Sequence, residues 1–219
     1  MRAVMKSVSP RICEKVASGD CTLLVSKTAP KCDAPFKGYI YCTKSTRAHM
    51  FHLYINGGIG RQKFGITGHW RSGKKVVEVN PHLPAYRYNS YLAEGKVIGE
   101  FVCDKVIKTC GWRLRGDTQQ CAKRTADEEA FPKLACLTID EIVKYAGSEN
   151  REVCGLHISD LKIYDKPKEL SEFYKPCPTK EKGDCLSCDC LADNDYGGVC
   201  TNNLTRAPQS WQYVQELEE

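Results

Sequence analysis

The clearest pattern along the chain is a set of short segments in which apolar positions alternate with polar ones, as is typical of β-strands. These segments are rich in β-branched and aromatic residues. We predict strands at residues 1–8, 22–25, 37–43, 96–108 and 155–164.

Helix signals lie between these predicted strands. Ser9 and Pro10 suit the N-cap and the first helical position, and Gly19 follows the expected end of that helix. A capping box at residues 138–141 opens a second helix, and we predict a third over residues 167–174. Short strands with flanking short helices predict an α+β domain built as a small β-barrel.

The composition changes near residue 175, where these patterns give way to Cys, Asp, Gly and Asn. We therefore predict a first domain over residues 1–175 and a tail over residues 176–219. A tail of this length is too short for a large apolar core, so we expect a cross-link such as a bound metal ion to stabilise it.

Cysteine is unusually frequent, with 14 copies in 219 residues. Nine copies are scattered over residues 13–154, where we expect small buried apolar side chains or idle thiols. The N-terminus has no apolar leader segment, so we expect a cytoplasmic protein with reduced thiols. The other five copies lie close together, at Cys177, Cys185, Cys188, Cys190 and Cys200.

The spacing of Cys185 and Cys188 supplies two zinc ligands from one tight turn. We predict that Cys177 and Cys200 complete a closed, structural Zn²⁺ site that staples the tail, with Cys190 as the alternative to Cys177. Disulfides in an extracellular tail and unliganded thiols are the competing interpretations.

Charge is distributed unevenly along the chain. Residues 1–125 hold 22 Lys or Arg and 8 Asp or Glu, whereas residues 126–219 hold 10 and 19. The net charge of +5 therefore combines a basic half with an acidic half. A basic half is typical of a protein that binds a polyanion, although the two halves could also attract each other within one fold.

The basic half contains a candidate nucleic-acid interface. Residues 34–77 hold eight Lys or Arg, no Asp or Glu, and interleaved aromatic residues. Cations that meet phosphates and rings that stack on bases are what single-stranded nucleic acid requires. A solvated loop with a few anchoring aromatics is the alternative. With a second basic cluster at residues 112–124, the candidate contacts are Tyr41, Lys44, Arg47, Arg61, Lys63, Trp70, Arg71, Lys74, Lys75, Arg113 and Arg115.

One strand carries a histidine and a serine of interest. His157 and Ser159 alternate and therefore share a face, while the neighbouring Asp160 faces the other way. This spacing alone does not indicate a hydrolase, because strand side chains usually serve packing.

Several blocks occur in an order that resembles the ASCH domain: SVSPRICEKVASGDCTLLVSK, PFKGYIYCTK, GKVIGEFVCDKV and GLHISDLKIYDKPKELSEFY. More narrowly, the chain is similar to ASCH proteins of phages and prophages of Gram-positive bacteria, including their Cys-rich tail. The resemblance implies a PUA-like β-barrel that binds RNA or a nucleotide. Compared with that family, the basic, Gly-rich stretch at about residues 45–93 is an atypical insertion.

The pocket motif of that family, Gly-x-Lys-x-x-Glu-x-Arg, is degraded here. Gly19 matches, but Cys21 stands at the lysine position, Leu24 at the acidic or threonine position, and Ser26 at the arginine position. A hydrolase of the family type needs an activated nucleophile, so we predict that the chain is not an enzyme. Lys27, the next residue, is retained and joins the candidate contacts.

We therefore expect a non-catalytic ASCH protein, encoded by a phage, that binds RNA or a nucleotide in the cytoplasm. The first alternative is a phage protein that inhibits a host enzyme or an anti-phage defence complex by protein interaction. The second is a degenerate nucleotide or RNA hydrolase, with Cys21 as a replacement nucleophile.

Overall fold

In the computed structural model of the protein, the description with side chains covers residues 2–44, 93–109, 125–177 and 202–217. Seven further strands are described by their backbone alone: β4 (Phe51–Tyr54), β5 (Gly58–Arg61), β6 (Gly68–Arg71), β7 (Lys74–Val77), β8 (Ser90–Leu92), β11 (Leu191–Ala192) and β12 (Val199–Cys200).

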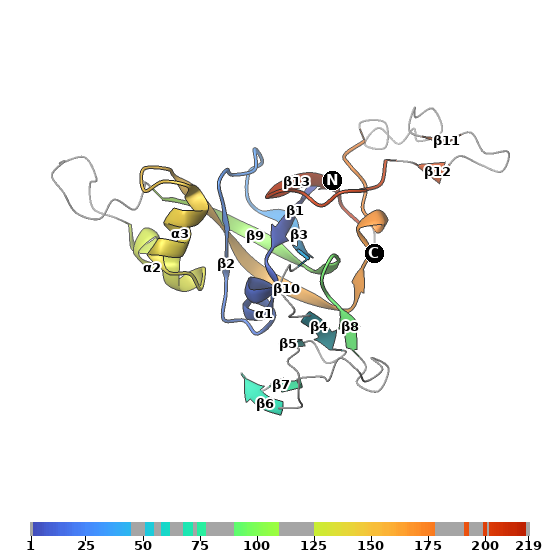
Figure 1. Ribbon diagram of the computed structural model, residues 1–219. Helices are drawn as coiled ribbons and strands as arrows, with labels where there is room; N and C mark the ends of the chain where they lie inside the picture. Colours follow the sequence, from blue (N-terminus) through green and yellow to red (C-terminus); the bar gives the residue numbers. More distant parts are fainter. Residues whose placement is uncertain are drawn as a thin grey trace.

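A mixed six-stranded sheet forms the centre of the molecule (Figure 1). The strands β1 and β3 run parallel, and the other neighbouring pairs are antiparallel. The order across the sheet is β13 (Trp211–Gln215), β1 (Arg2–Val8), β3 (Phe36–Cys42), β9 (Val97–Thr109), β10 (Val153–Lys168) and β2 (Leu23–Ser26).

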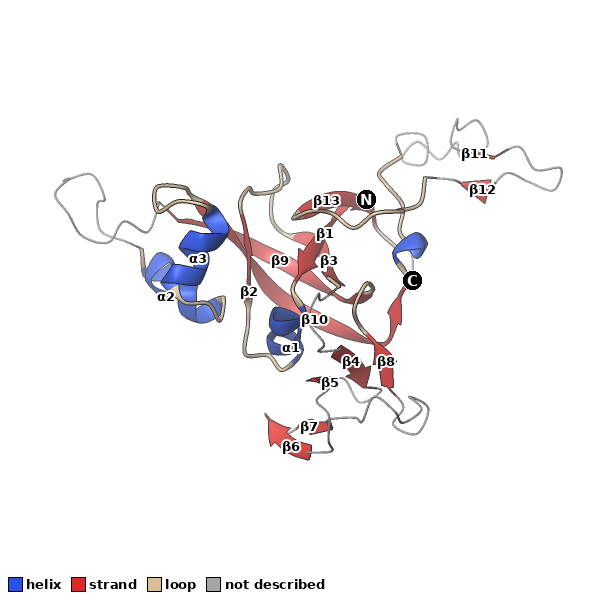
Figure 2. Ribbon diagram, viewed as in Figure 1, coloured by secondary structure: helices blue, strands red, loops and turns tan. Residues whose placement is uncertain are grey.

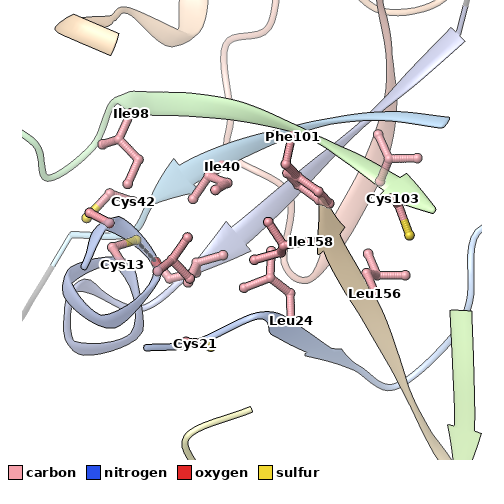
Figure 3. Close-up of a cluster of buried hydrophobic side chains, with 14 of the residues drawn as sticks. Cys13, Cys21, Leu24, Ile40, Cys42, Ile98, Phe101, Cys103, Leu156 and Ile158 are labelled. Atoms are coloured by element: carbon pink, nitrogen blue, oxygen red, sulfur yellow. Dashed lines mark hydrogen bonds between the residues drawn. The ribbon is translucent and has the colours of Figure 1, made fainter. Parts of the chain in front are cut away.

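Apolar side chains cover both faces of this sheet. Figure 3 shows the larger cluster, in which the thiols of Cys13, Cys42 and Cys103 pack as small apolar groups among aliphatic side chains and Phe101. Gly38 makes room for Phe101, because a Cβ there would lie 2.4 Å from the ring. The opposite face packs a separate cluster that includes Met5, Tyr39, Phe173 and Val214.

Three helices flank the sheet (Figure 2). Helix α1 (Pro10–Ala17) ends before Gly19, whose φ of +80° suits glycine. Both α2 (Ala126–Leu134) and α3 (Ile139–Ala146) begin with complete capping boxes. They bury Phe131 and Ile142 in a third apolar cluster.

The region of the predicted insertion contains short strands. Strands β5, β4 and β8 form a three-stranded sheet, and β6 pairs with β7. The register of that pair places Trp70 opposite Lys75 and Arg71 opposite Lys74. Strand β5 lies against α1 (Figure 1).

The α+β class is confirmed, but the closed barrel is not. In the described part of the chain, β13 and β2 remain the two edges of the sheet and form no ladder with each other. Side chains bridge the gap instead: the Trp211 indole N–H donates to the Thr28 carbonyl at 2.9 Å. The sheet is therefore open, with a side-chain seam between its edges.

Near the C-terminus, the structure differs from the prediction in two places. The helix predicted at residues 167–174 is wrong, because β10 continues to Lys168 and only the 3₁₀ turn Leu170–Glu172 follows. Strand β13, which no sequence pattern predicted, pairs with β1 in the main sheet although it lies within the range of the predicted tail. The Cys-rich part of the predicted tail falls mostly outside the described residues.

No helix within the described residues is both long and apolar enough to cross a membrane.

Candidate functional site

A cavity of about 320 Å³ lies between β1, α1, β2 and α3. Its walls are mostly apolar, with Val8, Ile12, Leu24 and Leu137 among them. Polar groups reach it from Lys6, Ser7, Tyr145 and other lining residues. A mostly apolar hollow with a few converging polar groups is the usual form of a small-molecule site.

Lys6 is the unusual polar group of this cavity. Alternation along β1 places it on the same face as Val4 and Val8, which belong to the larger apolar cluster. Its residue surface is only 4% exposed. Burial lowers the pKa of Lys6 from 10.5 to about 8, so the amine is still mostly charged at neutral pH.

The Lys6 ammonium has one hydrogen-bond partner in the described part of the chain, the Ser210 hydroxyl at 3.2 Å. No carboxylate of the described residues lies within ion-pair distance of it. An ammonium group has three N–H donors. The described residues therefore leave two donors of this buried cation for a ligand in the cavity.

A hydroxyl network holds Lys6 in place. The Ser210 oxygen lies 3.2 Å from the Ser26 hydroxyl and 3.4 Å from the Tyr145 hydroxyl. The Tyr145 ring also stands near two ammonium groups, with Lys6 at 6.0 Å and Lys27 at 5.5 Å from its centroid. Strands β1 and β2 and helix α3 thus each contribute to one polar cluster.

The C-terminal segment positions Ser210 for this contact. The Ser7 amide donates to the Ser210 carbonyl at 2.9 Å, and the Ser7 hydroxyl donates to the Pro208 carbonyl at 2.6 Å. On the other side, the Lys31 amide donates to the Tyr213 hydroxyl at 2.6 Å. The side-chain seam between β2 and β13 therefore also organises the polar end of the cavity.

The negative group that lines the cavity, Glu141, is already engaged. One carboxylate oxygen accepts from Arg11 at 2.6 Å, and the other accepts from the Thr138 amide at 2.9 Å. The Thr138 amide and the Arg11 guanidinium lower the pKa of Glu141. This carboxylate is therefore not available to neutralise Lys6.

A second polar pair lies on the strands β9 and β10. The His157 ring nitrogen Nδ1 is 2.6 Å from the Asp104 carboxylate, and this hydrogen bond lowers the pKa of Asp104. The Ser159 hydroxyl donates to the Val102 carbonyl at 2.9 Å. Asp160 is the acidic residue near His157 in the sequence, but Asp104 is its partner in the structure, because the β9–β10 pairing brings it from another strand. Neither member of the pair lines the cavity.

The structure describes the side chains of three predicted nucleic-acid contacts, Lys27, Tyr41 and Lys44. Lys27 lies beside the cavity through its contact with Tyr145. Tyr41 is only 6% exposed and packs in the second apolar cluster, and the side chain of Lys44 covers Gly95. Arg61, Trp70, Arg71, Lys74 and Lys75 are described by backbone alone, while Arg47, Lys63, Arg113 and Arg115 lie outside the described residues.

The three positions that the sequence comparison aligned with the ASCH pocket motif lie in or near the cavity wall. Leu24 lines the cavity, and Ser26 joins the hydroxyl network. Cys21 is buried, and burial raises the pKa of its thiol to about 11. A thiol with that pKa stays protonated at neutral pH and is a weak nucleophile.

The cysteines of the described region are free thiols. Cys13, Cys21, Cys42, Cys103 and Cys154 are buried, as predicted for the scattered set. Of the predicted zinc ligands, Cys177 is buried, Cys200 is described by backbone alone, and Cys185 and Cys188 lie outside the described residues. In the residues that are described with side chains, no cluster of three or more metal-binding groups occurs.

No protein-family model matches the chain, and no curated protein sequence matches it. It is similar to the solved crystal structure of ASCH from Zymomonas mobilis, with 12% identity and a TM-score of 0.48, over 98% of this chain and 88% of that one. Two variants of that protein, Tyr-to-Phe and Ser-to-Ala, match with a TM-score of 0.48 at 11% and 10% identity. These two matches each cover 98% of this chain, and 91% and 89% of the respective variant chains.

Proposed function

We propose that this chain is an RNA- or nucleotide-binding domain that takes one nucleotide into the cavity beside Lys6. The observation that carries the proposal is a charged lysine, buried in the cavity wall, without a carboxylate partner in the described residues. Burying a cation without a counter-charge is costly, so an anionic ligand would relieve that cost.

The rest of the cavity suits a nucleotide. Its volume of about 320 Å³ lies at the small end of the range for ligand sites. Apolar walls with an aromatic ring, here Tyr145, accept the faces of a base, while hydroxyls and an amide at the polar end offer hydrogen bonds. The basic segment of residues 34–77 would supply further phosphate contacts outside the cavity.

The proposal is for binding without turnover. The family motif positions hold Cys21, Leu24 and Ser26, and the Cys21 thiol is not activated. Lys6 and Lys27 act as cations that hold the ligand.

Fluorescence anisotropy with a labelled single-stranded RNA tests this function. We expect binding that weakens steeply as salt rises, because cation–phosphate contacts release counterions. We also expect Lys6→Gln to weaken binding at least several-fold, while the exposed control Lys144→Gln leaves it unchanged. The proposal would be refuted if no RNA binding occurred at low salt, or if the affinity did not change with salt concentration.

A pull-down from host lysate separates this function from the protein-interaction alternative. If the chain binds RNA, nuclease treatment removes the captured material. A partner protein that resists nuclease and competes with RNA for the cavity would support the alternative instead.

We also propose that Cys177, Cys185, Cys188 and Cys200 hold one structural Zn²⁺. Four thiolates form a closed site that stabilises a short segment. Native mass spectrometry should find one zinc ion in the wild-type chain and none in Cys188→Ser. The control variant Cys103→Ser, which changes a buried thiol of the main sheet, should retain the zinc ion. Zinc-free wild-type protein prepared without chelator would contradict this site.

A further inference from the structure

The polar end of the cavity presents a buried amine to a ligand. Lys6 lines the cavity, its residue surface is only 4% exposed, and its ammonium contacts the Ser210 hydroxyl at 3.2 Å. A phosphodiester inside an RNA strand continues in both directions and needs two exits. A terminal phosphate needs only one, so it can approach a buried amine such as that of Lys6 more easily than an internal phosphate can.

The charges around this end favour a doubly negative group. Lys6 and Lys27 both approach the Tyr145 ring, and neither has a carboxylate partner in the described part of the chain. Lys27 is exposed, so its long side chain can follow a ligand. A phosphate monoester carries nearly two negative charges at neutral pH and three acceptor oxygens, which matches two ammonium groups.

The other groups that face Lys6 do not supply the missing negative charge. Cys154 on β10 interacts with Lys6, but burial raises the pKa of its thiol to about 11, so it is neutral at pH 7. Tyr145 and Ser210 present hydroxyls. Glu141 on α3 is held by Arg11 and the Thr138 amide.

We propose that the cavity recognises the terminal phosphate of a nucleotide or of an RNA end, with Lys6 as the buried contact and Lys27 as the exposed one. This inference rests on the proposed function and specifies its ligand class. The base and sugar attached to that phosphate would occupy the apolar part of the cavity beside Leu24 and Tyr145.

Calorimetric titration with three forms of one short single-stranded RNA tests this inference: a 5′-phosphate form, a 3′-phosphate form and a form with hydroxyls at both ends. We expect one phosphate form to bind roughly tenfold or more tightly than the hydroxyl form, the size of a buried charged hydrogen bond. The matching nucleoside monophosphate, used as a competitor, identifies the source: competition indicates that a free nucleotide suffices, and its failure restricts the ligand to RNA ends.

Variants assign the contact to the two lysines. Lys6→Met should abolish the preference for the phosphate form, and Lys27→Gln should reduce it several-fold. Lys144→Gln, which removes an exposed lysine on α3 that does not line the cavity, should leave it intact. Equal binding of all three RNA forms to the wild-type chain would overturn this inference and leave the proposed function standing. If no form binds at low salt, both fail.

The pH dependence provides a test that needs no variant. The preference for the phosphate form should decline below about pH 6, where the phosphate gains its second proton, and above about pH 8, where free Lys6 loses its charge. A preference that stays constant from pH 7 to pH 10 would exclude Lys6 as the contact.

Discussion

Lys6 and the pair His157–Asp104 are two polar sites on the same sheet. They differ in whether the charged group has a partner that can carry the opposite charge. The carboxylate of Asp104 lies 2.6 Å from the ring of His157, and both side chains are partly exposed. Lys6 is buried and has only a hydroxyl partner among the described residues. The exposed pair is already satisfied, whereas the buried amine is satisfied only in part.

This difference indicates where ligand chemistry is expected. Exposed ion pairs are screened by solvent and contribute little to stability or to the selection of a ligand. A buried charge without a counter-charge lowers stability, and such groups cluster at functional sites. The His–Asp pair has the more familiar catalytic appearance, but Lys6 has both the cavity and a charge without a carboxylate partner among the described residues.

The largest expected effect is that of Lys6→Met, which should change binding and stability in opposite directions. Binding of the phosphate-ended RNA should fall by roughly tenfold or more. The free energy of unfolding at pH 7 should rise by up to about 3 kcal/mol, the equivalent of a pKa lowered from 10.5 to about 8. Denaturant titration and anisotropy measure the two changes. If Lys6→Met were destabilised, burial of the charge would not be the dominant cost at this position.

The stability difference should also depend on pH. Between pH 8 and 10.5 the unfolded chain binds more protons at Lys6 than the folded chain, so the wild type gains stability as pH rises. The advantage of Lys6→Met should therefore be constant below about pH 8 and disappear towards pH 10.5. Buried thiols such as Cys103, with a pKa raised to about 12, shift the stability of both proteins alike. Parallel pH profiles for the two proteins would contradict the lowered pKa of Lys6.

Substitution of Tyr145 should produce a smaller effect on binding. Tyr145→Leu should weaken RNA binding by about 1 kcal/mol, the low end of the contribution of a base stacked on an aromatic ring. Tyr145→Phe keeps the ring and loses only the contact with the Ser210 hydroxyl, so it should remain close to the wild type. Equal losses in both variants would show that the hydroxyl, and not the ring, matters.

The smallest effect is expected at the exposed pair. His157→Gln should change the free energy of unfolding by less than about 1 kcal/mol and should leave RNA affinity unaltered. Thermal unfolding and anisotropy measure both quantities. A large loss of affinity in His157→Gln would transfer the functional role from Lys6 to the exposed pair.

Capping residues, which act on neighbouring positions of the chain, predicted the ends of helices α1 and α3. The capping box at Thr138 and Glu141 marked the start of α3, and Pro10 and Gly19 bounded α1. Helix α2 was missed although Thr125 and Glu128 form the same kind of box, because Pro132 interrupts its interior. Local sequence therefore held enough information for all three helices.

Contacts between distant residues were harder to predict. Strand β13 pairs with β1 from the opposite end of the chain, and no local pattern indicates that partner. The same is true of the pairing that brings Asp104 to His157. In the sequence, Lys6 is a polar residue that interrupts an apolar run within a predicted strand. Its burial, which makes it a candidate ligand contact, is seen only in the structure. The degraded motif at Leu24 did point to the cavity wall.

The contact between Lys6 and Ser210 spans 204 positions of the chain. During synthesis at about 5–20 residues per second, Lys6 waits roughly 10–40 s for the segment that carries its hydroxyl partner. The polar end of the cavity is therefore among the last parts of the domain to be assembled. A nascent chain that lacks this segment presents its lysine without the Ser210 hydroxyl, so the proposed ligand would meet the complete polar end of the cavity only after residue 210 has been synthesised.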